Sequence, residues 1–431
     1  MSDTILESKY PITFHQDEAK TLGEHIRNNH SVALIGMKRV GISNFLRYFM
    51  YQPDISTTYI GDGKKHLFFP IDLNDLVERE IYPFWALTLK RIIDIAAITK
   101  LDKAVSDKIE ALFLSSIQSR DVFLVIDSVR MAIAAIVEQG YLPVLFFLRF
   151  DRITDATTPE FFNNLQGLKD ASNQQLTYVF TSFRSLDVLA PQVFTKNSLS
   201  SFAHNMYIKP LKKEDTKIVS ELYTKRYRLM LSGEEEKNLF DVVDGYVQYL
   251  QLALISLHEK KQIPDTKEAL FALLCADERI QLQSEELLAS LMPNEREVLQ
   301  KVIKGKPLTD ADRKEGKYLW DTGFIADDNV FSPLFVHYIQ QKEKAGAGDG
   351  GSVEFSKKEY MLFAYLEKHV DVICEREDVI AAVWPEVESF GVSDWAVDRL
   401  VARVRNKLKM QKSTYEIQTI KTRGYKLIKA N

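Results

Sequence analysis

The chain of 431 residues has only two cysteines, Cys275 and Cys374, far apart and without a CxxC spacing. This excludes a disulfide framework and fits a reducing compartment. None of the eight histidines forms an HExxH motif or stands beside a cysteine at zinc spacing, so the sequence indicates no metal site. No apolar run is long enough to span a membrane, and residues 1–10 lack the apolar segment of a signal peptide. We therefore expect a cytoplasmic protein without membrane contact.

A strong net charge is also missing. The chain carries 56 Lys and Arg against 60 Asp and Glu, a formal net charge of −4. Such a molecule is not a general binder of polyanions, so any affinity for nucleic acid must be local. Its 45% hydrophobic and 27% charged residues are ordinary for globular proteins, and its length predicts about three domains.

Charge is separated sharply near the C-terminus. Residues 392–431 hold ten Lys and Arg against three Asp and Glu, whereas residues 353–391 hold four against nine. One helical face of the basic part is apolar, formed by Val397, Leu400, Val401, Val404 and Leu408, and Ser393 stands where it can cap the helix. The other face carries Arg399, Arg403, Arg405, Lys407 and Lys409. Like charges at this spacing repel, which indicates an anionic partner such as nucleic acid.

Two β-rich runs follow this helix and complete a recognisable pattern. Residues 414–420 and 425–428 flank the tripeptide Thr422-Arg423-Gly424, which predicts a basic hairpin. Two further helices are expected before the basic helix. Helices followed by such a hairpin make a winged helix, the helix-turn-helix geometry with an added β wing.

Residues 353–431 resemble the OmpR/PhoB-type C-terminal DNA-binding domain. The resemblance rests on the segments Phe355–Tyr360, Glu375–Ile380, Val392–Asp398 and Ile417–Tyr425. It implies a double-stranded DNA partner, with Arg403 and Arg405 on phosphates and Lys421 or Arg423 in the minor groove. The expected DNA-binding residues are Arg399, Arg403, Arg405, Lys407, Thr419, Lys421, Arg423 and Tyr425. Ala402 and Arg399 depart from the family pattern, so no target sequence is implied. The alternative is a solvated basic surface, or a domain for protein contacts.

A glycine-bounded loop stands between a strand and a helix near the N-terminus. The buried run 31–36 leads into Gly36 and Gly41 at P-loop spacing, and an amphipathic helix follows. A working loop wraps phosphates with backbone N–H groups and adds a Lys and a Ser or Thr. Ser43 is present, but Ile42 stands at the Lys position. Candidate nucleotide-binding residues are Gly36, Lys38, Arg39, Gly41, Ser43 and Asp151. The alternative is a tight turn without a ligand.

Residues 18–48 resemble the P-loop ATPases of the STAND and archaeal ORC-like group, and the resemblance extends faintly over 10–340. It implies an α/β core with a parallel sheet, whose further strands lie at 66–73, 142–148 and 176–182. After the second of these the chain reads Arg149-Phe150-Asp151-Arg152, without the family's Asp-Glu pair. The Lys and this pair supply most of the catalysis, so we expect no catalytic residues and no hydrolysis. ATP or ADP with magnesium is the candidate cofactor, weakened by the missing Lys.

The pattern divides the chain into five parts. We predict a degenerate P-loop core at 1–205, a helical lid at 206–282, a structural first winged helix at 283–343, a flexible Gly-rich linker at 344–352 and the DNA-binding winged helix at 353–431. This organisation favours a transcriptional regulator over an enzyme, with a sensory or oligomerising body that forms a homo-oligomer or binds a protein partner. One alternative is a STAND-type NTP-dependent signalling or defence ATPase with a DNA- or trigger-recognising C-terminal domain. The other is a pseudo-ATPase scaffold in a larger complex.

Overall fold

The computed structural model describes residues 5–61, 63, 65–99, 101–194, 202–261, 263–346, 355, 357–385, 394–411, 413–420 and 423–429. The chain divides into two compact units. Unit 1 comprises Met1–Ile218 with Asp321–Gly323, and unit 2 comprises Val219–Trp320 with Phe324–Asn431. No helix in the described ranges is both long enough and apolar enough to cross a membrane.

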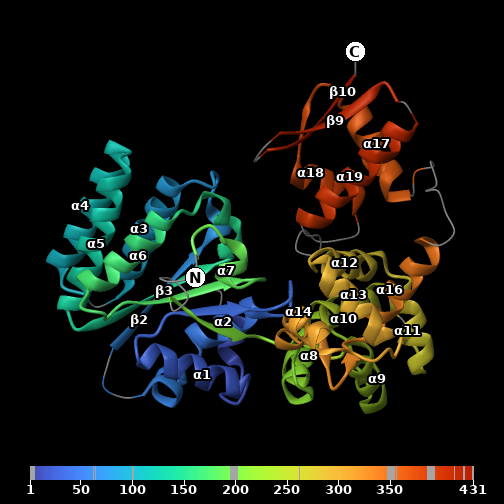
Figure 1. Ribbon diagram of the computed structural model, residues 1–431, viewed down its shortest axis with the longest axis horizontal. Helices are drawn as coiled ribbons and strands as arrows, with labels where there is room; N and C mark the ends of the chain where they lie inside the picture. The colour runs from blue at the N-terminus through green and yellow to red at the C-terminus, as the bar shows by residue number, and fades with distance from the viewer. Residues whose placement is uncertain are drawn as a thin grey trace. The chain divides into compact units, whose positions relative to one another are not determined.

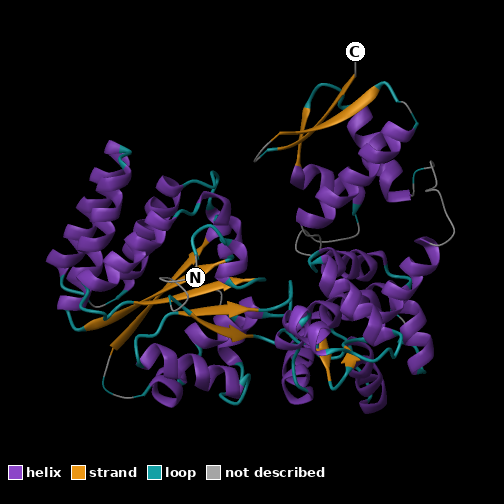
Figure 2. Cartoon of the chain, viewed as in Figure 1, coloured by secondary structure: helices purple, strands orange, loops and turns teal. Residues whose placement is uncertain are grey.

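Unit 1 is built on a parallel sheet that has five strands among the described residues (Figure 2). The strands are β1 (Val32–Ile35), β2 (Lys65–Asp72), β3 (Tyr141–Leu148), β4 (Thr177–Ser182) and β5 (His204–Tyr207). Their order is β2-β3-β4-β1-β5, and every neighbouring pair is parallel. All residues of β1 and β4 are buried, as expected for strands covered on both faces. The predicted α/β core is therefore confirmed, while β5 was not anticipated.

Helices cover both faces of this sheet (Figure 1). The α-helices of unit 1 are α1 (Gln16–Arg27), α2 (Ile42–Tyr51), α3 (Ile81–Ile98), α4 (Lys103–Ser119), α5 (Val122–Glu138), α6 (Pro159–Ala171) and α7 (Leu186–Leu189). Short helical turns are η1 (Leu6–Lys9), η2 (Ser56–Ile60), η3 (Leu73–Asp75), η4 (Phe150–Arg152) and η5 (Thr154–Ala156). Figure 1 shows α1 and α2 on one face and α3 to α6 on the other. Aromatic side chains fill the core between sheet and helices, for example Phe84 against Phe147, with ring centroids 5.0 Å apart.

The first part of unit 2 is helical. Its helices are α8 (Lys213–Tyr227, which begins in unit 1), α9 (Gly233–Val243), α10 (Val247–Lys260), α11 (Lys267–Cys275), α12 (Glu278–Ala289), α13 (Pro293–Ile303), α14 (Asp310–Glu315), α15 (Lys317–Asp321) and α16 (Pro333–Gly346). A small antiparallel hairpin, β6 (Ile325–Ala326) and β7 (Asn329–Val330), lies between α15 and α16. Helix α16 reaches Gly346, so the first three residues of the predicted linker are helical instead. Residues 347–352 of that linker lie outside the described residues.

The C-terminal part of unit 2 has the predicted winged-helix elements. They are α17 (Lys357–Lys368), β8 (Ile373–Glu375), α18 (Arg376–Val383), α19 (Asp394–Met410), β9 (Tyr415–Ile420) and β10 (Gly424–Lys429). The predicted apolar face of α19 is confirmed, because Val397, Leu400, Val401, Val404 and Leu408 are all buried in one core with Leu362, Trp384 and Leu427. The predicted cap, Ser393, lies outside the described residues.

The wing pairs with a third strand, β8, that the sequence did not predict. Strand β10 pairs with β9 on one side and with β8 on the other. Gly424 has φ 148°, and a Cβ atom added there would lie 2.0 Å from the carbonyl oxygen of Cys374 in β8. Only glycine fits this close approach of two backbones.

Candidate functional site

The basic side chains on α19 have acidic partners within unit 2. Arg399 donates from Nε to Oε1 of Glu285 on α12, at 2.9 Å, and Arg403 forms an ion pair with the same carboxylate. Lys342 of α16 adds a third cation at 3.9 Å. The Glu285 side chain is only 6% exposed, whereas those of Arg399 and Arg403 are 43% and 37% exposed. One buried carboxylate thus collects three cations, and carboxylate and phosphate oxygens accept the same guanidinium hydrogen bonds.

The next basic residues of α19 hold the wing and the first helix of the domain. Arg405 donates from Nε to the carbonyl oxygen of Ile417 at 2.7 Å and from Nη2 to Oγ1 of Thr419 at 2.7 Å. Lys407 donates to Oε2 of the buried Glu359 on α17 at 2.8 Å. The like-charge repulsion expected along α19 is therefore offset in part inside the chain. Arg405 and Thr419 are placed side by side, where one phosphate could accept from both.

Three further residues were expected to bind DNA: Lys421, Arg423 and Tyr425. Arg423 is exposed at the turn before β10, and its backbone N–H bonds the carbonyl oxygen of Ile420 at 3.1 Å. Lys421 lies outside the described residues. Tyr425 is fully buried, and its hydroxyl donates to Asp398 of α19. The structure therefore corrects the expectation for Tyr425, because a side chain enclosed in the core braces the wing from within and has no surface to offer DNA.

The glycine-bounded loop stands between a strand and a helix, as a P-loop does, and its interior is apolar. It joins β1 to α2, Gly41 has φ 117°, and Met37 and Val40 are buried. A Cβ atom at Gly36 would lie 2.8 Å from Cγ1 of Val40 and 2.9 Å from the carbonyl oxygen of Ile208, so the loop is packed tightly. The side chain of Ser43 is exposed in the first turn of α2, where backbone N–H groups can face an anion.

The other basic residues of the loop also have contacts. Arg39 is exposed, with φ 60°, and the Lys38 ammonium lies 5.0 Å from the centroid of the Phe183 ring. Cation–π contacts of this kind compete with a phosphate for the ammonium group. Whether Lys38 or Arg39 supplies the charge that is missing at Ile42 stays a prediction.

The acidic residue expected near the magnesium ion is displaced from the strand. Strand β3 ends at Leu148, and Asp151 lies in the η4 turn that follows. Burial raises the pKa of Asp151 above its usual range, although Lys38, Arg152 and Arg149 oppose the shift. Arg149 pairs with Asp72 at the end of β2, and its backbone N–H donates to Oγ1 of Thr181 at 2.8 Å. A cation thus stands next to the strand end where a magnesium-binding ATPase needs carboxylates.

Among comparisons with known proteins, a family model matches the C-terminal part of the chain. Residues 350–427 match the family model described as "Transcriptional regulatory protein, C terminal". No curated protein matches the chain. Solved structures similar to it include the Walker-type ATPase of Pyrococcus abyssi, with 14% identity, TM-score 0.49 and coverage of 78% of this chain and 99% of that one.

Two further structures come from Aeropyrum pernix. The ORC2 protein in its ADPNP–ADP complexes has 11% identity, TM-score 0.45 and coverage of 80% and 99%. The ORC1 protein in complex with DNA has 13% identity, TM-score 0.39 and coverage of 80% and 86%. These similarities concern the fold alone. The assignment of a P-loop core rests on the strand–loop–helix order of β1, Gly36 to Gly41 and α2 in unit 1. The match to the C-terminal domain of transcriptional regulatory proteins covers residues 350–427, which follow a body with an α/β P-loop core.

Proposed function

We propose that the protein is a cytoplasmic transcriptional regulator that binds double-stranded DNA through α19 and the wing. The observation that carries the proposal is the family match over 350–427 together with the basic side chains on α19. Arg399, Arg403, Arg405 and Lys407 supply cations for phosphates, and Thr419 adds a hydroxyl beside Arg405. Phosphate contacts of this kind fix the position of a protein on the duplex, while base contacts in the groove supply specificity.

In this proposal the P-loop body is a sensory or oligomerising module that does not hydrolyse nucleotide. The Lys that would neutralise charge on the transferring phosphoryl group is replaced by Ile42. Asp151 is half-buried in a turn, its pKa is raised, and no Glu follows it to orient a water molecule. Loss of both elements removes most of the electrostatic stabilisation on which phosphoryl transfer depends. Ser43 and the backbone of the loop retain the means to hold ADP or ATP weakly.

Control of DNA binding follows from the contact between α12 and α19. Arg399 and Arg403 cannot donate the same hydrogen bonds to Glu285 and to a DNA phosphate at once. We propose that Glu285 competes with DNA, and that a change in the body releases α19 from α12. Association of two bodies would then pair two C-terminal domains on adjacent half-sites. The second domain would bind at an effective concentration near millimolar, which raises affinity roughly a hundredfold.

The test is a titration of the purified protein with labelled DNA from its own upstream region and with scrambled DNA, across salt concentrations. A regulator binds its true site at least roughly a thousandfold more tightly than scrambled DNA. Equal and steeply salt-dependent binding to both would leave only a phosphate-binding surface. That result would overturn the proposal and favour the signalling ATPase or the scaffold. DNA-stimulated ATP hydrolysis that Ser43→Ala abolishes would select the ATPase of these two.

A further inference from the structure

Three histidines from separate parts of the sequence meet at one edge of the sheet in unit 1. His25 lies in the last turn of α1, His30 in the turn before β1, and His204 at the start of β5. One ring nitrogen from each lies within 4.8 Å of the others. The ring centroids of His25 and His204 are 4.9 Å apart, and those of His30 and His204 are 5.2 Å apart. Among the described residues this is the group of side chains with a metal-ligand composition.

Backbone hydrogen bonds hold the three residues in place. The N–H of His30 donates to the carbonyl oxygen of His25 at 2.9 Å, across a turn in which Asn29 has φ 55°. This is the bond that closes a helix C-terminus when the chain turns through a left-handed residue. The N–H of His204 donates to the carbonyl oxygen of Ser31 at 2.8 Å, and β5 runs parallel to β1 from that point. Because the backbone is held in this way, the imidazole rings can move only by rotation about their side-chain torsions.

The surroundings of His25 favour its neutral form. Burial lowers the pKa of His25, His204 and His30 lower it further, and Glu24 opposes the shift. Neutral imidazole is the form that ligates a metal, because the protonated ring has no free lone pair. No carboxylate belongs to the described cluster.

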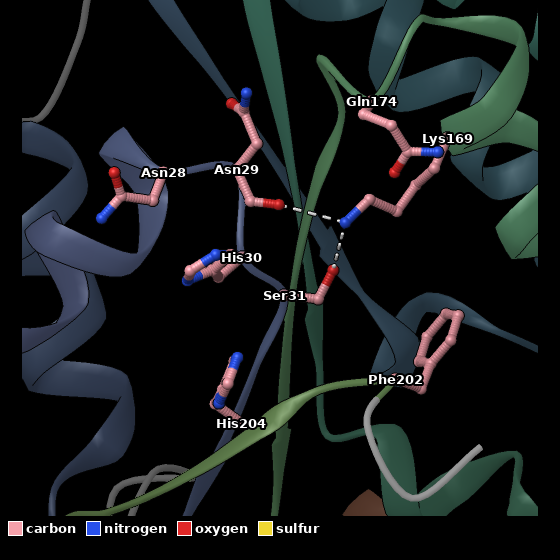
Figure 3. A pocket seen from close by; sticks show the side chains of 8 residues that line it. All are labelled: Asn28, Asn29, His30, Ser31, Lys169, Gln174, Phe202 and His204. Carbon is pink, nitrogen blue, oxygen red and sulfur yellow. Dashed lines mark hydrogen bonds between the residues drawn. The ribbon is translucent and has the colours of Figure 1, made fainter. Parts of the chain in front are cut away.

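A pocket of about 260 Å³ adjoins the cluster, lined by Asn28, Asn29, His30, Ser31, Lys169, Gln174, Phe202 and His204 (Figure 3). Lys169 donates to the carbonyl oxygen of Asn29 at 3.1 Å and to Oγ of Ser31 at 3.3 Å. In the view of Figure 3, His30 and His204 lie on one side of the segment Asn29–Ser31 and Lys169 on the other. The ammonium group is thus held by other partners and does not fill the space between the imidazoles.

We propose that His25, His30 and His204 form a binding site for one divalent transition-metal ion, with Zn²⁺ the best match. Zinc accepts imidazole nitrogens at about 2.0 to 2.1 Å, so three ligands in a tetrahedral arrangement stand about 3.4 Å apart. The nitrogens must approach one another by at most about 1.4 Å, and rotation of the exposed rings of His30 and His204 can bring them together. Three protein ligands leave the fourth position to water or another small ligand. The metal would join α1, β1 and β5, and this inference is independent of the DNA-binding proposal.

The test is calorimetric titration of the full-length protein with zinc chloride after chelator treatment and dialysis. We expect one ion per chain, and at least roughly a hundredfold weaker binding in the double variant His30→Ala with His204→Ala. Both side chains are exposed, so the double variant should fold as the wild type does. His258→Ala, at an exposed histidine outside the cluster, is the matched control and should bind normally.

Cobalt supplies a second readout that reports coordination directly. Co²⁺ added to the metal-free wild type should give the visible absorption of a four-coordinate ion, and the double variant should not. Zinc should also raise the melting temperature of the wild type and of His258→Ala but not of the double variant. Absence of zinc binding in the wild type, or equal binding in the double variant, would overturn the inference. The thiols of Cys275 and Cys374 remain in every variant, so the difference isolates the histidines.

Discussion

Two regions of the molecule are candidates to hold phosphate, and they use different chemistry. Helix α19 offers cationic side chains, and four of them already have partners in the chain: Glu285, Glu359, and oxygens of Ile417 and Thr419. The loop from Gly36 to Ser43 offers backbone geometry, but an apolar Ile42 replaces its expected charge. Side-chain charge gives strong, salt-dependent contacts, whereas a backbone loop without its Lys gives weak ones. The difference is the basis of the proposal that DNA is the principal phosphate ligand.

The largest expected effect tests the α19 side of this comparison. The double variant Arg403→Ala with Arg405→Ala should lose roughly 3 to 6 kcal/mol of DNA-binding free energy, since each charge-assisted hydrogen bond contributes about 1.5 to 3 kcal/mol. The loss should be similar on all DNA sequences. Fluorescence anisotropy across salt concentrations should show a log–log slope shallower by about 1.8, because two phosphate contacts are gone.

The matched control is Lys314→Ala with Lys317→Ala, two exposed lysines of the first winged helix. These substitutions should leave DNA binding unchanged, because that part of unit 2 is expected to be structural. An unchanged salt slope in the α19 double variant would contradict the phosphate assignment of Arg403 and Arg405.

The second effect is the loss of stability when a glycine of the wing or of the loop is replaced by alanine. Gly424→Ala should destabilise the wing by about 3 kcal/mol, because the added Cβ meets the Cys374 carbonyl oxygen and the positive φ is strained. Gly36→Ala should cost less, about 1 to 2 kcal/mol, since its Cβ would lie 2.8 Å from Val40 and 2.9 Å from the Ile208 carbonyl oxygen, contacts less severe than the 2.0 Å approach at Gly424. Urea unfolding measures both, with Gly233→Ala, where a Cβ meets nothing, as the control. Equal stability of Gly424→Ala and Gly233→Ala would show that β8 does not constrain the wing.

The third effect restores the charge that the loop lacks. Ile42→Lys should tighten MgATP binding about tenfold, or about 1.4 kcal/mol, because the ammonium reaches the β- and γ-phosphates. We expect no hydrolysis by this variant, since the Asp-Glu pair is still missing. Titration with a fluorescent ATP analogue measures the change, and Ile42→Met is the apolar control. Similar affinities for the Lys and Met variants would favour a tight turn without a ligand.

The smallest expected effect comes from the ion pairs that Glu285 makes with Arg399 and Arg403 of α19. Glu285→Gln should raise DNA affinity, because it removes the charge that competes with DNA for Arg399 and Arg403. The gain should be only threefold to tenfold, or about 1 kcal/mol, because solvent screens ion pairs with arginines that are more than a third exposed. The gain should fade at high salt. Glu278→Gln, on the same helix, is the control and should bind as the wild type does. Unchanged affinity in Glu285→Gln would mean that Glu285 does not compete with DNA.

The sequence by itself determined the character of the local elements. Alternating and helical periodicities, such as the apolar face of α19, depend only on residues close together in the chain, and the structure confirms that face as core. The P-loop core was predictable for the same reason, because its strand, loop and helix are consecutive. The resemblance of residues 353–431 to a known family also predicted the wing, and the family model that matches residues 350–427 confirms this resemblance.

Tertiary structure alone decided which distant residues meet. Strands β5 and β8 are too short to show a period, and only pairing with β1 and β10 makes them strands. The burial of Tyr425 follows from that packing, and so does the meeting of Glu285 with α19. His204 reaches His25 and His30 only because β5 lies beside β1. No spacing rule along a chain encodes such contacts, because their geometry is set by the order of strands and the packing of helices.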